Sequence, residues 1–106
     1  MKVNNLDNFI RGWFVGNFEP TLYKTNDVEV AVQYYKKGTN GRSHIHKIAS
    51  EITVVISGKV KINTVIFKEK DIIFIEPNEI SSFEAIEDTT TLVVKIPGAK
   101  NDKYEI

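Results

Sequence analysis

The sequence contains no cysteine and has no excess of charge of either sign. Without thiols, the chain can form no disulfide, no zinc–cysteine site and no thiol nucleophile. Lysine plus arginine equals aspartate plus glutamate, at 14 each. This balance gives no indication of a nucleic-acid partner or of an anionic membrane surface. Histidine is also scarce, because the chain holds only two.

Long apolar runs are missing as well. Residues 1–8 are polar apart from Val3 and Leu6, which is unlike the apolar stretch of a signal peptide. No segment is long and apolar enough to cross a bilayer as a helix. We therefore expect a cytoplasmic protein with no membrane partner.

Short apolar runs separated by turn residues fill the chain, and none has a helical period. Val28–Tyr35 alternates, with Val28, Val30, Val32 and Tyr34 on one face, as in a half-buried strand. Ile52–Ile56 and Ile72–Ile75 are almost wholly apolar, which favours strands buried on both faces. About ten such runs predict an all-β fold.

The length of 106 residues favours one domain. We expect a single domain over 1–106, with 1–8 as a loosely held leader. Pro97-Gly98 should end the fold and leave 99–106 as a polar tail. The aromatic-rich segment 11–20 predicts an edge strand and a turn. Its aromatic side chains would cover the core or a subunit interface, or form a wall at a pocket mouth.

The two histidines and one glutamate form the clearest candidate site. His44 and His46 are one residue apart, so a strand would direct both imidazoles to one face. Residues 47–50 let the chain turn, and Glu51 opens the next strand-like run. Two imidazoles and a carboxylate form a set that binds divalent metals and leaves positions open. The alternative is a surface His-x-His pair beside a solvated glutamate.

The residues around this cluster resemble the first signature motif of the cupin superfamily. Gly38, His44, His46, Glu51 and Gly58 match every fixed position at the motif's spacing. Gly38 suits a turn, because glycine accepts positive φ, and Gly58 suits a tight hairpin. The resemblance implies a double-stranded β-helix (jelly-roll) cupin barrel with a metal inside its open end.

The second cupin motif is degenerate in this chain. Its expected residues are Gly, Pro, Gly, His and Asn, and the aligned positions are Lys70, Glu76, Asn78, Ser81 and Ala85. The third histidine is therefore replaced by serine, a weak neutral ligand. Iron, manganese, nickel or zinc would still suit the remaining set, but weakly, or the metal would be absent.

Strand parity extends the candidate site to a pocket. If Glu51 faces the cavity, Thr53 and Val55 share its side, while Ile52, Val54 and Ile56 pack outward against the other sheet. From the second motif region we expect Ser81 at the third-ligand position and Phe83 pointing inward.

Three functions remain open at this point. The first is a metal-dependent oxygenase or isomerase that acts on a small metabolite. The second is a non-catalytic module that binds a sugar or another metabolite. The third is an accessory protein whose histidines survive from an ancestor. Because small cupins often pair their open sheets, we also expect a homodimer.

Overall fold

The computed structural model describes all residues, 1–106, and its regular structure is almost entirely β-strand. The all-β prediction is confirmed, with ten strands and two short 3-10 helices in the chain. In order, the elements are η1 Leu6–Asn8, η2 Ile10–Gly12, β1 Trp13–Val15, β2 Glu29–Tyr35, β3 His44–His46, β4 Ser50–Ser57, β5 Lys59–Ile62, β6 Val65–Lys68, β7 Ile72–Ile75, β8 Phe83–Ala85, β9 Thr89–Ile96 and β10 Lys103–Glu105.

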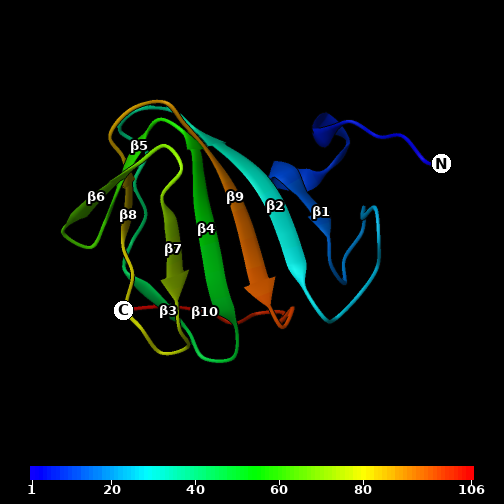
Figure 1. The fold of residues 1–106 in the computed structure, drawn as a ribbon. Coiled ribbons are helices and arrows are strands. Elements are labelled where there is room, and N and C mark those ends of the chain that lie inside the picture. The colour runs from blue at the N-terminus through cyan, green and yellow to red at the C-terminus, as the bar shows by residue number, and fades with distance from the viewer.

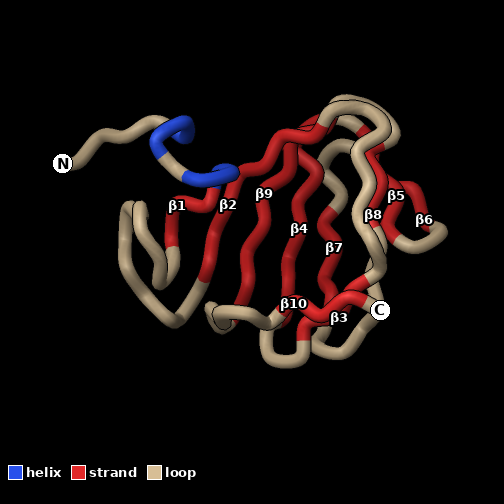
Figure 2. The backbone as a smooth tube through the Cα atoms, turned by 180° about the vertical axis from the view of Figure 1, so that it is seen from behind, coloured by secondary structure: helices blue, strands red, loops and turns tan.

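The strands form one large sheet and two smaller ones, all antiparallel. The large sheet has the order β1-β2-β9-β4-β7, and β6-β5-β8 form a second sheet. β10 pairs with β3 across one end of the molecule (Figures 1 and 2). Isolated bridges join Asn40 to Glu84 and His44 to Ser81, so the β3 segment is tied to the β8 segment. The chain thus closes into a barrel with β3 near one end.

The hydrophobic core fills the barrel interior beyond the first residues of β4. Val55 and Val60 are fully buried, and Ile62 joins them. Phe67, Ile73 and Phe83 pack against this cluster from the surrounding strands. The β-branched residues of β4 and β5 suit these positions, because they pack well on a pleated surface.

The outer face of the large sheet is apolar and exposed, contrary to one prediction. Ile72 and Phe74 of β7 are 66% and 55% exposed, so β7 is not buried on both faces. On the neighbouring strand, Ile56 is exposed and Ile52 only half-buried, so these outward residues do not pack against another sheet. Within one chain, the second sheet covers only the inner face of the large one.

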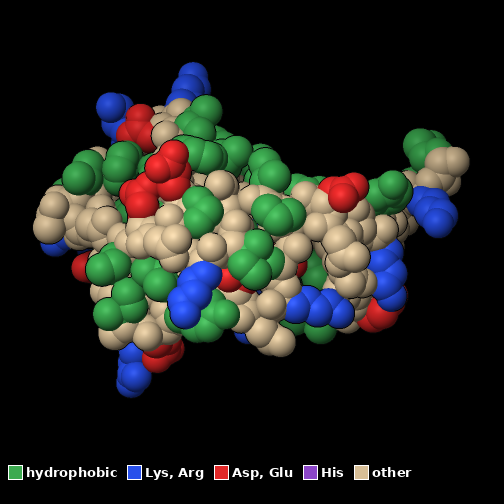
Figure 3. Space-filling view, turned by 90° about the horizontal axis from the view of Figure 1, so that it is seen from below, with side chains coloured by type: hydrophobic (Ala, Val, Ile, Leu, Met, Phe, Trp, Pro, Cys, Tyr) green, Lys and Arg blue, Asp and Glu red, His purple; other side chains and the backbone are tan.

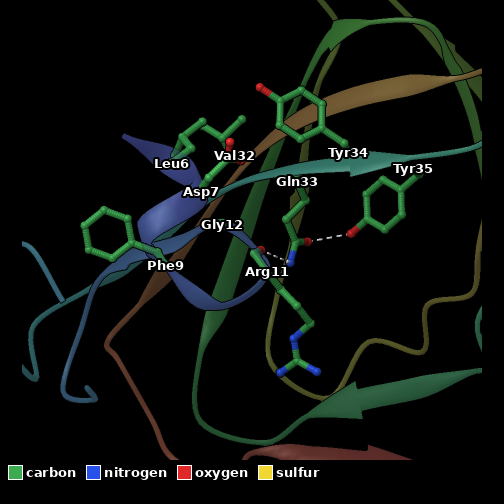
Figure 4. Close-up of a pocket in the computed structure, with 9 residues that line it drawn as sticks. All are labelled: Leu6, Asp7, Phe9, Arg11, Gly12, Val32, Gln33, Tyr34 and Tyr35. Carbon is green, nitrogen blue, oxygen red and sulfur yellow. Dashed lines mark hydrogen bonds between the residues drawn. The ribbon is translucent and has the colours of Figure 1, made fainter. Parts of the chain in front are cut away.

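Strand β2 alternates as predicted, but its inner face is the more polar one. Ala31 is buried and shares the inner face with Gln33 and Tyr35. Val32 and Tyr34 lie on the outer face, where η1 and η2 pack near them (Figure 4). The apolar period therefore marks the outer side of this strand.

The motif glycines both adopt positive φ, at 89° for Gly38 and 92° for Gly58. A side chain at Gly58 would also collide with the backbone of Asp88, since its Cβ would lie 2.3 Å from the carbonyl oxygen. The predicted hairpin is nevertheless wrong. Gly58 connects β4 to β5, which belong to different sheets, so it forms a corner of the barrel.

The two ends of the chain behave differently. The first residues project from the body of the molecule (Figures 1 and 3). The expectation that the fold ends at Gly98 is wrong, because β10 pairs with β3 over its whole length and Asp102 is buried. The segment 99–106 is therefore part of the barrel.

No helix is long and apolar enough to span a membrane.

Candidate metal and ligand site

The two histidines and Glu51 converge at the β3 end of the barrel. The ligand atoms that they offer all lie within 4.8 Å of one another. The rings of His44 and His46 stand nearly perpendicular, with their centroids 5.1 Å apart. The Nδ1 of His44 lies 3.3 Å from the carbonyl oxygen of Arg42, a contact that orients its ring and leaves Nε2 available. The three side chains form a possible metal-binding triad.

His46 is buried, and its Nε2 has no hydrogen-bond partner. The residue is 5% exposed, and its Nδ1 lies 3.5 Å from an oxygen of Glu51. Burial lowers the pKa of His46 to about 4, and the positive charge of Lys95 adds to this effect. The imidazole is therefore neutral at neutral pH, and a buried polar nitrogen without a partner calls for an explanation.

A carboxylate and a phenol share the interior next to the histidines. Burial raises the pKa of Glu51, while the positive charge of Lys95 opposes the shift. Burial also raises the pKa of Tyr35, and the negative charge of Glu51 contributes. The Tyr35 hydroxyl donates to Gln33 Oε1, and its ring centroid lies 4.6 Å from that of Phe83. Tyr35 thus stays a protonated donor close to an acid.

Asp102 fixes the turn between the histidine strand and Glu51. Its carboxylate accepts hydrogen bonds from the backbone N–H groups of Lys47, Ile48 and Ala49, at 2.9 to 3.1 Å. Burial alone would raise the pKa of Asp102, but these N–H groups outweigh it and lower the pKa. The carboxylate therefore holds the loop that sets His46 against Glu51.

A cavity of about 500 Å³ surrounds the cluster, within the range of small-molecule sites. Ser81 and Phe83 line it, as expected, together with His44, His46 and Glu51. Thr53 and Val55 do not line it. Both are buried deeper in the barrel, where Val55 belongs to the core.

Solved structures of low sequence identity share this architecture. A double-stranded β-helix protein from Klebsiella pneumoniae is 22% identical, with a TM-score of 0.70 over 100% of this chain and 99% of that one. An RmlC-like cupin from Shewanella frigidimarina is 18% identical, with a TM-score of 0.66 over 74% of this chain and 72% of that one. No protein-family model and no curated protein matches the sequence.

The chain has a cupin fold. The nucleoside dehydratase Pac13 of Streptomyces shares it at 16% identity, with a TM-score of 0.66 over 77% of this chain and 70% of that one. The fold predicted from the sequence is thereby confirmed.

Two residues in the segment that we aligned with the second cupin motif have a backbone conformation that favours glycine. Lys70 and Asn78 stand where the pattern has glycine, and both have positive φ, at 77° and 69°. Ser81 exchanges two backbone hydrogen bonds with His44, at 2.9 and 3.0 Å. Ser81, the residue expected at the third-ligand position, therefore lies beside His44.

Sequence reasoning missed several residues around this cupin cavity. Asp102 gave no signal, because a lone aspartate in a polar segment looks like a surface residue. The aromatic segment was expected to contribute a pocket wall only as an alternative, and Trp13 does line the cavity. Further lining residues that parity on β2, β9 and β10 could have indicated are Gln33, Tyr35, Lys95 and Lys103.

Proposed function

We propose that the protein is a metal-dependent enzyme acting on a small metabolite, with the cation held by His44, His46 and Glu51. The observation that carries the proposal is the buried Nε2 of His46, which has no partner in the chain. A divalent cation would give this nitrogen a partner. The carboxylate of Glu51, whose charged form is disfavoured by burial, would gain an opposite charge.

The donor set fits iron, manganese, nickel or zinc. Two neutral imidazoles and one carboxylate suit these ions, and the remaining positions stay open for a ligand. A cation held there would supply Lewis acidity toward a substrate oxygen and, if it is iron, redox chemistry. Because Ser81 replaces the third histidine of the cupin pattern, we expect weaker binding than in a complete site.

The other residues of the cavity would position the substrate and keep bulk water away from it. Trp13 and Phe83 offer apolar walls, and the protonated hydroxyl of Tyr35 lies close enough to feel the charge of Glu51. If no metal is bound, Glu51 becomes a general base, because its raised pKa brings it closer to neutral pH. Isomerisation and oxygenation both remain within this proposal.

The alternative is a non-catalytic cupin that binds a sugar or another metabolite. The observation in its favour is Ser81, which leaves the metal set incomplete. The polar side chains would then act as hydrogen-bonding anchors in a cavity that is large enough for a small molecule. Solved structures of this fold include a nucleoside dehydratase and a protein described as a sugar phosphate isomerase, which supports a small-metabolite ligand under either proposal.

Elemental analysis tests the metal proposal directly. Protein purified without a chelator or a histidine tag should retain close to one divalent ion per chain. His46→Ala should lose the ion and Glu51→Gln should retain less, while Glu84→Gln, an exposed carboxylate on β8, should retain it in full. Circular dichroism shows whether each variant is folded.

The two proposals give opposite results in this experiment. If none of the four ions is retained after loading, the metal-dependent mechanism is refuted, and only general-base catalysis by Glu51 would be left to the enzyme proposal. A rise in melting temperature with sugars, sugar nucleotides or keto acids, without any metal, would then support the binding protein.

We also propose a homodimer formed through the outer face of the large sheet. Ile56 on β4 and Ile72 and Phe74 on the adjacent β7 are exposed on this face, and neighbouring exposed apolar side chains are typical of a protein–protein contact. Light scattering should give twice the chain mass, and Phe74→Glu should halve it. The matched control is Ile66→Glu on β6, an exposed residue of the other sheet. A monomeric parent protein would refute this proposal.

A further inference from the structure

Charged side chains are unevenly distributed around the site cavity. Over the whole chain, cations and acids are equal in number. Around the cavity, however, Glu51 is the one carboxylate, and four cationic residues line it: Arg11, Arg42, Lys95 and Lys103. The overall balance therefore hides a local positive excess, and such an excess in a cleft attracts anions.

Both lysines of the cavity lie directly beside the His–Glu cluster in the strand register. Lys95 on β9 is opposite Glu51 on β4, and Lys103 on β10 is opposite His46 on β3. Cross-strand partners point to the same face of a sheet. The Nζ of Lys95 also lies 5.0 Å from the ring centroid of Trp13, another residue of the cavity wall.

Three of the four cations have no acidic partner. Arg42 pairs with Glu105 at 3.4 Å, but Arg11, Lys95 and Lys103 take part in no salt bridge. The neighbours of Lys95 in the register, Glu51 and Glu29, form no salt bridge with it. Cations that line a polar cavity without an acidic partner are able to form charge-assisted hydrogen bonds with an anionic group.

These cations also occupy the boundary between two adjoining cavities. Arg11, Trp13, Lys95 and Lys103 line both the site cavity and a second one of about 480 Å³. The side chain of Arg11 extends away from Leu6 and Phe9 (Figure 4), and its backbone carbonyl accepts a hydrogen bond from Gln33. The second cavity is also lined by the acids Glu19, Glu29 and Asp102. An anionic group on the site-cavity side of this boundary would therefore meet the cations and leave the rest of a ligand beside the cluster.

We infer that the ligand is a small acid, a metabolite with a carboxylate or phosphate group that Lys95, Lys103 and Arg11 bind next to the His–Glu cluster. The inference rests on the proposed function, because it assigns the ligand class of that same cavity. A neutral sugar would leave all three cations without an anionic partner.

Calorimetric titration with malonate, inorganic phosphate and malonamide tests this inference. Malonamide has the shape of malonate without its charge. Each probe is titrated into metal-free and metal-loaded protein, in the parent chain and in Lys95→Gln, Lys103→Gln and Lys61→Gln. Lys61 lies on β5 and does not line the cavity, so it controls for the loss of a lysine elsewhere.

We expect the metal-free parent to bind malonate or phosphate, and to bind malonamide much more weakly. Lys95→Gln or Lys103→Gln should weaken the binding about tenfold, as the loss of a charged hydrogen bond does, and Lys61→Gln should not. The tighter probe tells a carboxylate ligand from a phosphate. Equal binding of malonamide, an equal loss in Lys61→Gln, or no anion binding by the folded protein would overturn the inference.

Metal content, measured on the same samples, separates this inference from the proposed function. Anion binding by a protein that retains no ion would support the inference and count against the metal site. Retention of the ion without anion binding would support the metal site and count against the inference.

Discussion

The two ends of strand β4 contrast sharply, although their side chains share one face. Glu51, at the start of the strand, stands among histidines and lysines in a cavity. Val55, four residues later, is fully buried in the core. The alternation of a strand determines which residues point inward, but depth in the barrel determines whether an inward residue meets a ligand or another side chain. Chemistry and stability are thus separated along a single strand.

Truncation at the buried end should have the largest effect on stability and none on the site. Val55→Ala removes two methyl groups from a fully buried position and should lower the free energy of unfolding by about 2 kcal/mol. Urea denaturation measures this. The metal content per folded chain should not change, and Val65→Ala, on an exposed position of β6, should have little effect. If Val55→Ala lost metal while its stability stayed unchanged, chemistry and stability would not be separated along β4.

A substitution that loosens the loop between the two histidines and Glu51 should lower both the stability of the fold and the affinity for metal. Asp102→Asn replaces a carboxylate that accepts bonds from three backbone N–H groups, so it should cost about 1–2 kcal/mol and weaken metal binding. The exposed Asp27→Asn should do neither.

Protonation of Asp102 at low pH should destabilise the fold for the same reason as the substitution Asp102→Asn. Because the pKa of Asp102 is lowered in the fold, its stabilisation is complete above the unfolded value, about 3.9. It is lost as the pH falls through the folded value. Urea midpoints between pH 7 and pH 3 measure this loss, which Asp102→Asn should lack. A parallel decline in parent and variant would contradict the assignment.

The sequence predicted the fold and the three residues of the cluster because short-range rules govern them. The period of two determines the direction of His44 and His46, and motif spacing brings Glu51 to them. The same rule predicted the alternation of β2 but not which face turns inward, and the apolar face is the outer one. A cavity that needs polar walls reverses the usual relation between polarity and burial.

The residues that were missed depend on contacts distant in the sequence. Asp102 meets the Lys47–Ala49 loop across more than fifty positions, and Lys103 meets His46 through the β10–β3 ladder. Neither spacing follows a local rule. The exposure of Phe74 could not be read from the sequence either, because an apolar strand does not reveal whether a second chain covers it.

A third imidazole at the open end of the barrel should strengthen metal binding without affecting the packing of the core. Ser81→His places it beside His44, to which the backbone at Ser81 is bonded. We expect the dissociation constant for nickel or zinc, measured by competition with a chelating dye, to fall at least about tenfold, comparable to the effects of residues that support a metal site. Ser57→His, at the exposed far end of β4, is the control. An unchanged constant would mean that position 81 does not face the metal.

Neutralising Glu51 should have the smallest effect of these substitutions, and it should stabilise the metal-free fold where the others destabilise it or leave it unchanged. Burial raises the pKa of Glu51, so its carboxylate destabilises the metal-free fold above the raised value, and this penalty disappears as the pH falls below about 4.3. Glu51→Gln should therefore raise the melting temperature of the metal-free protein by a few degrees at pH 7, and by less at pH 4, while Glu84→Gln should not. Added metal should stabilise the parent more than Glu51→Gln. A lower melting temperature for metal-free Glu51→Gln at pH 7 would show that the carboxylate serves the fold, and the open end would then no longer differ from the core.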